Sequence, residues 1–186
     1  MALSSTVFKA QLHVADMDRH YYAEHALTVA RHPSETDVRM MVRILAFALN
    51  ADEALTFGRG LSAEGEPDLV QTDLTGAIVR WIDVGLPDER ALRKACGRAQ
   101  HVMLYTYGRG HEVWWQNQRK AVIKLDNLTV IQLDAEVTRA LADMAERTMQ
   151  LQCNIEDGDI WFGSGDQGVS LRCEVLHTGS RVPARA

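Results

Sequence analysis

Two aspartates are the residues of this chain most suited to chemistry. Asp68 follows Pro67 at the start of one expected strand, and Asp83 lies between Ile82 and Val84 near the end of the next. A carboxylate inside so apolar a strand is costly to bury unless it is paired with a cation or binds a metal. The two aspartates are therefore the leading candidates for a functional site.

The spacing of the two aspartates predicts that they meet. If Thr75 and Gly76 form a two-residue hairpin turn, counting outward places Asp68 directly opposite Asp83. Opposed residues of an antiparallel pair have Cβ atoms about 4.5–5.5 Å apart. Two carboxylates at that separation repel unless they share a proton or a cation, and Mg²⁺, which takes one or two carboxylates, suits them. A turn one residue longer would send them to opposite faces unless a bulge compensated.

Basic residues lie on two expected helices near these aspartates. In the helix expected at residues 34–50, Glu35, Arg39 and Arg43 recur at intervals of four and share one face. Cations that hold phosphates, beside a metal that activates water, would suit a phosphodiester substrate. The second helix, expected at residues 87–98, carries on its polar side Arg90, Arg93, Lys94 and Arg98. For this helix alone, a solvated face with surface ion pairs is the simpler interpretation.

The elements that must position these residues alternate between strands and helices. Strands are expected at residues 6–15, 21–30, 55–57, 68–72, 77–84, 100–107, 128–133, 155–162 and 169–176, with hairpins at both ends of the chain. Helices are expected at residues 34–50, 87–98, 112–125 and 135–152, the first of them capped by Ser34. This order predicts a mixed α/β domain in which some strands run parallel.

Length and composition restrict the class of protein. The 186 residues, 46% of them apolar, suit one globular domain, expected at residues 1–179, with a disordered tail at residues 180–186. No apolar run approaches the roughly 18 residues of a spanning helix, so no membrane association is expected. Three cysteines without CxxC spacing predict reduced thiols and a cytoplasmic protein. The net charge of −5 disfavours bulk coating of nucleic acid but is compatible with a small basic cleft.

Several familiar motifs can be set aside. Gly163, Gly165 and Gly168 match GxGxxG, but the sequence that follows is typical of a strand, so we expect these glycines in a hairpin and no bound dinucleotide. His111 and Glu112 begin a zinc motif whose second histidine is absent. No glycine-rich loop of the phosphate-binding type occurs, so no nucleotide cofactor is expected.

A resemblance adds to this interpretation. In order, the chain carries the blocks HPSETDVRMMVRILAFAL, EPDL, DLTG, WIDVG, PDE and RKACGRA, and it resembles across nearly its whole length the YaeQ family of small, functionally uncharacterised bacterial proteins. The fold of that family is similar to the PD-(D/E)XK nuclease superfamily, also called restriction endonuclease-like. The superfamily core is a helix, three strands, a helix and a strand, and the elements expected from residue 34 to residue 107 follow that order. The resemblance implies such an α/β core with added N- and C-terminal β-hairpins.

The resemblance also assigns roles. Pro67 and Asp68 match the PD element, and Asp83-Val84-Gly85 matches (D/E)xK, except that Gly85 stands where the lysine belongs. The implied mechanism places one or two Mg²⁺ ions on Asp68 and Asp83 and a lysine beside the developing negative charge. A basic residue of the following helix can replace the missing lysine. The further residues to which the resemblance gives a role are Lys94 as that replacement, with Arg93 a weaker candidate, and Glu35 as an additional acid. A role at the N-terminal end of the helix dipole is the alternative for Glu35. From the basic faces of the two helices, the expected contacts to phosphate are Arg39, Arg43, Arg93 and Arg98.

Three hypotheses follow. The first is a Mg²⁺-dependent nuclease that hydrolyses nucleic-acid phosphodiesters. The second is a catalytically inactive module on the same scaffold that binds nucleic acid or a protein of the transcription or repair machinery, a reading favoured by Gly85 and by the net acidity. The third is that Asp68 and Asp83 are structural and are tied to Arg39 or Arg43 in a buried ion network.

Overall fold

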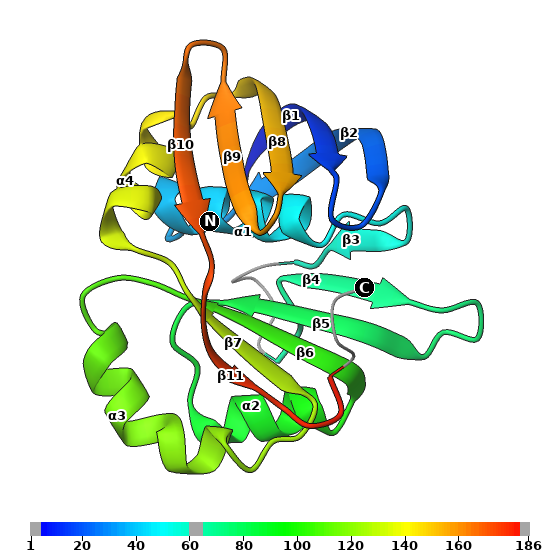
Figure 1. The fold of residues 1–186 in the computed structure, drawn as a ribbon, viewed down its shortest axis with the longest axis vertical. Helices are drawn as coiled ribbons and strands as arrows, with labels where there is room; N and C mark the ends of the chain where they lie inside the picture. The colour runs from blue at the N-terminus through cyan, green and yellow to red at the C-terminus, as the bar shows by residue number, and fades with distance from the viewer. Residues whose placement is uncertain (1–4, 60–64, 183–186) are drawn as a thin grey trace.

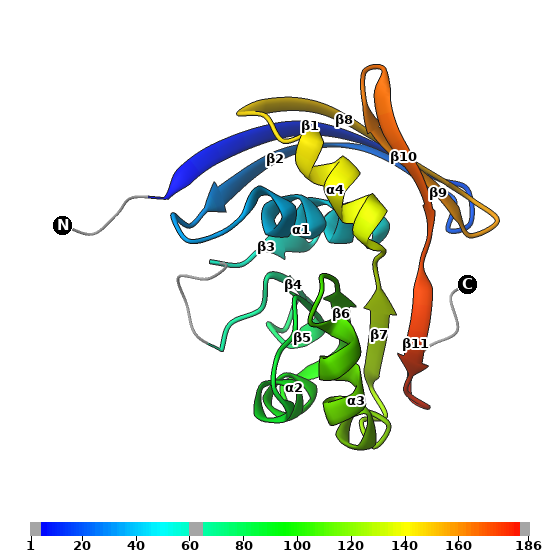
Figure 2. The ribbon, with the colours of Figure 1, turned by 90° about the vertical axis from the view of Figure 1, so that its left-hand side faces the viewer.

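The computed structural model describes residues 5–59 and 65–182 and contains two facing β-sheets (Figures 1 and 2). The five-stranded sheet has the order β10-β9-β8-β1-β2, and the six-stranded sheet has the order β11-β7-β6-β5-β4-β3. In the first sheet only β1 and β8 are parallel. In the second sheet β5, β6 and β7 are parallel, while β3, β4 and β11 join antiparallel. The predicted mixed α/β class with some parallel strands is confirmed.

The described strands divide between the two sheets, and the described helices lie between strands along the chain. The strands of the five-stranded sheet are β1 (Thr6–Asp16), β2 (Tyr21–Arg31), β8 (Thr148–Glu156), β9 (Asp159–Ser164) and β10 (Gln167–Arg172). The strands of the six-stranded sheet are β3 (Leu55–Phe57), β4 (Leu69–Thr72), β5 (Ile78–Val84), β6 (Ala99–Thr106), β7 (Leu128–Gln132) and β11 (Glu174–Thr178). The helices of the described residues are α1 (Asp37–Leu49), α2 (Glu89–Cys96), α3 (His111–Val122) and α4 (Ala135–Asp143). From α1 to β6 the order is helix, three strands, helix and strand, as the sequence predicts.

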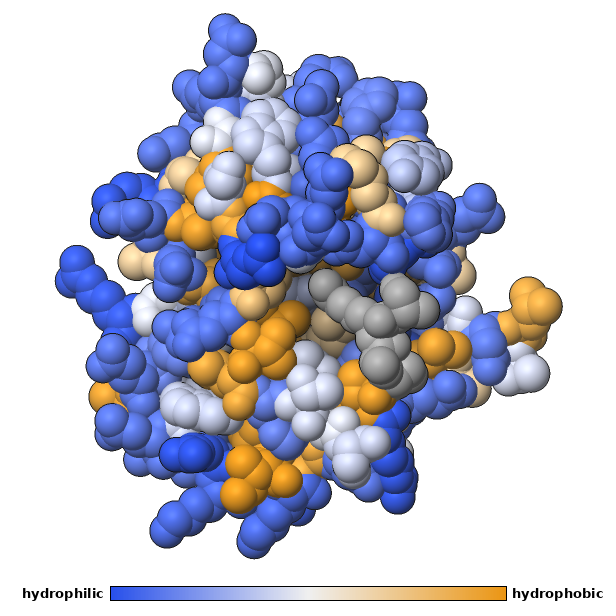
Figure 3. Space-filling model, viewed as in Figure 1, coloured by the Kyte–Doolittle hydropathy of each residue, from blue (hydrophilic) through white to orange (hydrophobic). Residues whose placement is uncertain are grey.

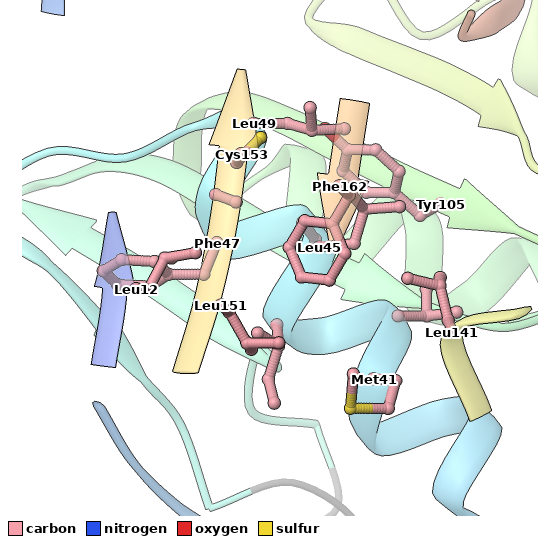
Figure 4. Packing of buried hydrophobic residues seen from close by; sticks show 14 of the residues in the cluster. Leu12, Met41, Leu45, Phe47, Leu49, Tyr105, Leu141, Leu151, Cys153 and Phe162 are labelled. Carbon is pink, nitrogen blue, oxygen red and sulfur yellow. The ribbon is translucent and has the colours of Figure 1, made fainter. Parts of the chain in front are cut away.

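Helix α1 lies between the two sheets, and α4 packs beside it (Figure 2). All residues of α1 from Met40 to Leu49 are buried, because the helix is apolar on nearly every side. Side chains of α1, the five-stranded sheet, the six-stranded sheet and α4 converge in one core (Figure 4). A second, smaller core forms where α2 and α3 cover the other face of the six-stranded sheet. Apolar side chains therefore fill the space between each helix and the sheet face that it covers.

Helix α1 begins later than the sequence suggested. Thr36 is the N-cap, and its hydroxyl accepts a hydrogen bond from the Arg39 amide at 3.2 Å. Ser34, the predicted cap, instead lies 2.6 Å from the His32 imidazole. The prediction was wrong because two capping residues stand two positions apart, and the spacing of apolar residues cannot separate them. Glu35 consequently precedes the helix rather than occupying its first turn.

The hairpin of β4 and β5 has a longer turn than the predicted Thr75-Gly76. The Asp73 amide donates to the Ala77 carbonyl and the Gly76 amide to the Asp73 carbonyl, each at 3.0 Å, with Gly76 at φ +85°. A bulge then shifts the register between Gln71 and Thr72. Beyond the bulge Leu69 pairs with Ile82, so the next step outward sets Asp68 opposite Asp83. The turn prediction was wrong, yet the bulge restores the predicted opposition.

The C-terminal third departs most from the sequence prediction. The helix expected at residues 135–152 ends at Asp143, and residues 148–156 form β8, whose side chains alternate between exposed and buried. The buried ones are Met149, Leu151, Cys153 and Ile155, a strict period of two. The final hairpin is β9 and β10, with Gly163 paired to Gly168, so these glycines lie in a hairpin as predicted. A further strand, β11, returns to the six-stranded sheet.

Two remaining sequence predictions concern the ends of the chain and the membrane. Within the tail expected at residues 180–186, the Arg181 amide donates to the Asp126 carbonyl at 2.7 Å and its guanidinium pairs with the Asp126 carboxylate at 2.8 Å. Residues 183–186 lie outside the described part. None of the described helices has both the length and the apolar character that crossing a bilayer requires.

Candidate functional site

Arg39 joins two acidic residues from separate elements. Its guanidinium donates to both oxygens of Asp68, at 2.8 and 2.9 Å, and to Glu35 at 2.9 Å. Asp68 stands directly before β4, and its Oδ2 also accepts from the Val84 amide of the neighbouring strand at 2.9 Å. Such charge-assisted contacts fix the position of the Asp68 carboxylate between α1 and β5.

Arg43, one turn further along α1, is almost completely buried, with a side chain 1% exposed. Its guanidinium donates to both Glu35 oxygens at 3.1 Å and approaches Asp68 at 3.6 Å. It also lies over the Phe57 ring, 5.5 Å from the centroid. The predicted common face of Glu35, Arg39 and Arg43 therefore exists, and it points into the protein. The ion network of the third hypothesis is present for Asp68.

Asp83 is bound differently. Its Oδ1 accepts from the Asp68 amide at 3.2 Å and its Oδ2 from the Trp81 indole at 2.8 Å. Among the described residues no arginine, lysine or histidine forms an ion pair with it. The pKa of Asp83 is raised to about 6, first by burial and also by the nearby Asp68 charge, although the hydrogen bonds from the Trp81 indole and the Asp68 amide and the charge of Arg39 all lower it. Asp83 is thus the uncompensated acid of the cluster.

The basic residues of α2 lie outside this network. Lys94 is exposed, and its ammonium packs against Gly65, where a Cβ atom would collide with it. Arg93 pairs with Glu89 on the helix surface at 2.6 Å. No hydrogen bond or ion pair joins either of these side chains to Glu35, Asp68 or Asp83 in the part of the chain that the structure describes. The structure therefore brings together Arg39, Arg43 and the three acids, and leaves Lys94 and Arg93 outside this network.

Arg98 reaches the site through an aromatic ring. Its guanidinium lies over the Trp81 indole, 5.4 Å from the centroid, and it donates to the Gly65 carbonyl at 3.5 Å. The same indole holds Asp83. Sequence reasoning missed Trp81, although a tryptophan two positions from an aspartate on one strand shares its face. Arg98 therefore packs on the Trp81 indole, and its Nη1 is taken by the Gly65 carbonyl.

Tyr107 is the second residue that the sequence did not single out. It follows β6, the parallel neighbour of β5, so it lies at the same carboxyl edge as Asp83. Burial raises the pKa of the Tyr107 phenol, Arg39 lowers it, and Asp68 and Glu35 raise it, so these charges lie within electrostatic range of the ring. In sheets with parallel strands, ligands bind outside the carboxyl ends. This rule could have drawn attention to Tyr107.

The donor set permits a magnesium ion but no dense metal centre. Within residues 5–59 and 65–182, no group of three or more His, Cys, Asp or Glu side chains is arranged to hold a metal. Mg²⁺ needs only one or two carboxylates, since it keeps several waters. From the described residues, each Asp83 oxygen accepts a single hydrogen bond and so retains a lone pair. Oδ1 of Asp68 likewise accepts one hydrogen bond, from Arg39, and retains a lone pair. Asp83 and Asp68 therefore fit a hydrated divalent cation.

Known proteins resemble this chain along almost its full length. The uncharacterized protein YaeQ of Escherichia coli (strain K12) is 47% identical over 173 residues, covering 92% of this chain and 95% of that protein. The protein of the same name from Salmonella typhi is 45% identical over 174 residues, covering 92% and 96%.

Solved structures agree with these relatives. The crystal structure of the YaeQ protein from Xanthomonas axonopodis pv. citri has a TM-score of 0.90 at 46% identity and covers 94% of this chain and 99% of that one. The crystal structure of YaeQ from Pseudomonas syringae has a TM-score of 0.89 at 34% identity, covering 95% and 98%. The family model described as YaeQ protein matches residues 1–173. The chain belongs to the YaeQ family.

Proposed function

We propose that the chain is a Mg²⁺-dependent phosphodiesterase that acts on nucleic acid, with the ion held by Asp83 and Asp68. The observation that carries this proposal is that the two opposed aspartates have different partners. Asp68 is paired with Arg39, whereas Asp83 has no described cation partner although it lies beside another carboxylate. A divalent cation would supply the missing charge. The helix-strand-strand-strand-helix-strand order supports a PD-(D/E)XK-like core around this pair.

The chain's own residues would give such a site its geometry. Arg39 and the Val84 amide hold Asp68, while the Trp81 indole and the Asp68 amide hold Asp83. When bound, Mg²⁺ supplies an activated water and stabilises charge on the phosphate. Lys94, exposed beside Gly65, is the lysine available to meet a phosphate that approaches from the side of α2.

The first test is metal binding followed by cleavage. Calorimetric titration with Mg²⁺ and with Mn²⁺ should show binding that Asp83→Asn abolishes and that Asp166→Asn, an exposed aspartate at the tip of the β9–β10 hairpin, leaves unchanged. Single-stranded, double-stranded and branched DNA and RNA, end-labelled and incubated with either metal, should be cut by the wild type and by Asp166→Asn only. Cleavage that persists in Asp83→Asn or Asp68→Ala would remove these residues from the mechanism.

The role of Lys94 has a separate test. Lys94→Met should lower the rate of cleavage while metal affinity stays the same, since the ammonium would act on the phosphate and not on the ion. Lys120→Met, which removes an exposed lysine from the last turn of α3, is the matched control. Equal rates for the two variants would show that Lys94 plays no part.

A second function is favoured by Gly85. Because the lysine position of the (D/E)xK pattern holds a glycine, and no described basic side chain replaces it beside Asp83, the scaffold also suits an inactive module that binds nucleic acid or a protein of the transcription or repair machinery. Retention of labelled DNA or RNA by the wild type, without cleavage and without any need for divalent metal, would favour this module over the enzyme.

A further inference from the structure

An apolar crevice of about 550 Å³ lies between the two sheets, beyond the end of α1. The helix stops at Asn50, whose amide donates to the Tyr105 hydroxyl at 2.7 Å. The row of β6 side chains on that face continues past the helix with Met103 and His101. These two residues therefore face the five-stranded sheet with no helix between, and both line the crevice.

The crevice is separate from the aspartate cluster. Asp83 lies near the carboxyl end of β5, whereas His101 lies near the amino end of the parallel strand β6. Strand β11 borders the crevice through Val175 and Thr178, because the chain passes from β10 in the five-stranded sheet directly to β11 in the six-stranded sheet. Figure 3 shows apolar side chains gathered in the middle of this face of the molecule. A volume of this size falls within the range of small-molecule sites, about 300–1,000 Å³.

The described residues that line the crevice are mostly apolar, and one of them is a cation. Its floor is formed by buried aliphatic side chains of both sheets, namely Met103, Ile131, Ile155 and Ile160. His101 and Thr129 lie 3.1 Å apart and are hydrogen-bonded to each other. Of the described lining residues, Arg172 is the one with a permanent charge, and no acidic side chain lines the crevice. Charge complementarity therefore favours an apolar ligand that carries an anion.

Arg172 can exchange its present partner at little cost. It pairs with Asp159 at 2.7 Å, but its side chain is 62% exposed and that of Asp159 is 72% exposed. Ion pairs this exposed contribute little to stability, because water screens them and both side chains lose freedom in holding the contact. A ligand carboxylate placed beside apolar walls would make the stronger partner, since it is partly withdrawn from water.

We propose that this crevice binds a small aliphatic carboxylate, with the chain on the floor of Met103, Ile131, Ile155 and Ile160 and the carboxylate on Arg172. The inference is independent of any phosphodiesterase activity, because it shares no residue with the aspartate cluster. It names a class of ligand, a monocarboxylate with a short alkyl chain, that the apolar floor and the single cation would select together.

The test compares three probes of equal chain length: octanoate, 1-octanol and octylammonium. Calorimetry with the full chain should give octanoate an affinity at least about tenfold higher than either of the others, as expected for one charge-assisted contact. Nuclear magnetic resonance should show octanoate shifting the methyl signals of Met103, Ile131 and Ile160. Absence of these shifts, or equal affinity for octanoate and octanol, would overturn the proposal.

Two exposed substitutions make the test specific without disturbing the core. Arg172→Gln should weaken octanoate about tenfold, while Arg119→Gln, on the surface of α3, should have no effect. Val175→Glu adds an acid to the lining of the crevice at a residue that is 53% exposed, and it should repel octanoate but not octanol. Val113→Glu, at a valine of α3 that is 62% exposed, is its control. Octanoate binding that is unchanged in both Arg172→Gln and Val175→Glu would contradict the assignment.

Discussion

Asp68 and Asp83 oppose each other across β4 and β5, yet they have different electrostatic environments. The carboxylate of Asp68 accepts two hydrogen bonds from Arg39. Within the described residues, the carboxylate of Asp83 accepts hydrogen bonds only from the neutral Trp81 indole and a backbone amide. Formally, the three ionised acids Glu35, Asp68 and Asp83 meet the two guanidinium groups of Arg39 and Arg43, and one negative charge is left over. Asp83 carries that excess, and its pKa is raised, first by its burial and then by the neighbouring Asp68 charge.

The first prediction concerns pH. The pKa of Asp83 is raised from 3.8 to about 6 in the folded state, so the folded protein binds this proton more tightly than the unfolded chain does. The stabilisation from protonated Asp83 is therefore complete below about pH 4 and is lost as pH rises through 6. Asp83→Asn removes this dependence. Between pH 4 and pH 7.5 the unfolding free energy of Asp83→Asn should gain about 2 kcal/mol relative to the wild type.

Urea unfolding at several pH values checks this prediction, because the other titrating groups are common to the two proteins. A wild-type-minus-variant difference that stays constant from pH 4 to pH 7.5 would contradict the raised pKa. Saturating Mg²⁺, if it binds as proposed, should lower the apparent pKa of Asp83 and stabilise the wild type most above pH 6, where the carboxylate is ionised.

The second prediction concerns the buried arginine. Arg43→Met removes one of the two cations that face Glu35 and Asp68, and both of these acids are buried. We expect a loss of about 3–5 kcal/mol in the free energy of unfolding, since a buried carboxylate is left without its partner. Arg93→Met, which breaks an exposed pair with Glu89, should cost less than about 1 kcal/mol.

A double-mutant cycle separates the ion pair from the loss of packing. If the Glu35 interaction dominates, Glu35→Gln combined with Arg43→Met should be more stable than the sum of the two single losses predicts. Additive losses would mean that Arg43 acts mainly through its packing on Phe57.

The third prediction concerns Trp81. Trp81→Phe keeps an aromatic ring beneath Arg98 but removes the hydrogen bond that lowers the pKa of Asp83. The pKa of Asp83 should therefore rise above its value of about 6. Titration of the Asp83 carboxyl carbon by nuclear magnetic resonance measures this directly, with Trp115→Phe as the control for loss of an indole. An unchanged midpoint in Trp81→Phe would show that the indole does not set the charge of Asp83.

The sequence predicted that Asp68 and Asp83 oppose each other, although the structure reaches this opposition through a different turn. The spacing of Arg39 and Arg43 follows from the period of the helix, so their common face was predictable, whereas Glu35 joins them from the residues before α1. The detail of the turn was not predictable, because a longer turn and a bulge cancel each other in the register. The local sequence pattern predicts which face a side chain occupies better than it predicts the exact length of the loop between two strands.

Other features depend on tertiary contacts that no local pattern contains. Residues 148–152 of β8 were predicted as helix because residues 135–152 include enough apolar positions for either period, and only pairing with β1 and β9 decides. The contacts from Arg98 through Trp81 to Asp83 join the segment between α2 and β6 to β5, so the sequence could draw attention to these residues but could not show that they touch. The inward direction of Arg43 likewise follows from the burial of α1 between two sheets.

The last prediction explains the missing lysine. Gly85 has φ +115°, a conformation that side chains with a Cβ rarely adopt, and a Cβ atom there would meet nothing within 4 Å. Gly85→Ala and Gly85→Lys should therefore destabilise the fold by similar amounts, about 1–2 kcal/mol, because the cost lies in the backbone and not in crowding. Thermal or urea unfolding of both variants gives the comparison. A lysine variant as stable as the wild type would show that the backbone can relax, and the glycine would then need an explanation in terms of function. If Gly85→Lys were much less stable than Gly85→Ala, the extra loss would show that the long lysine side chain makes an unfavourable contact.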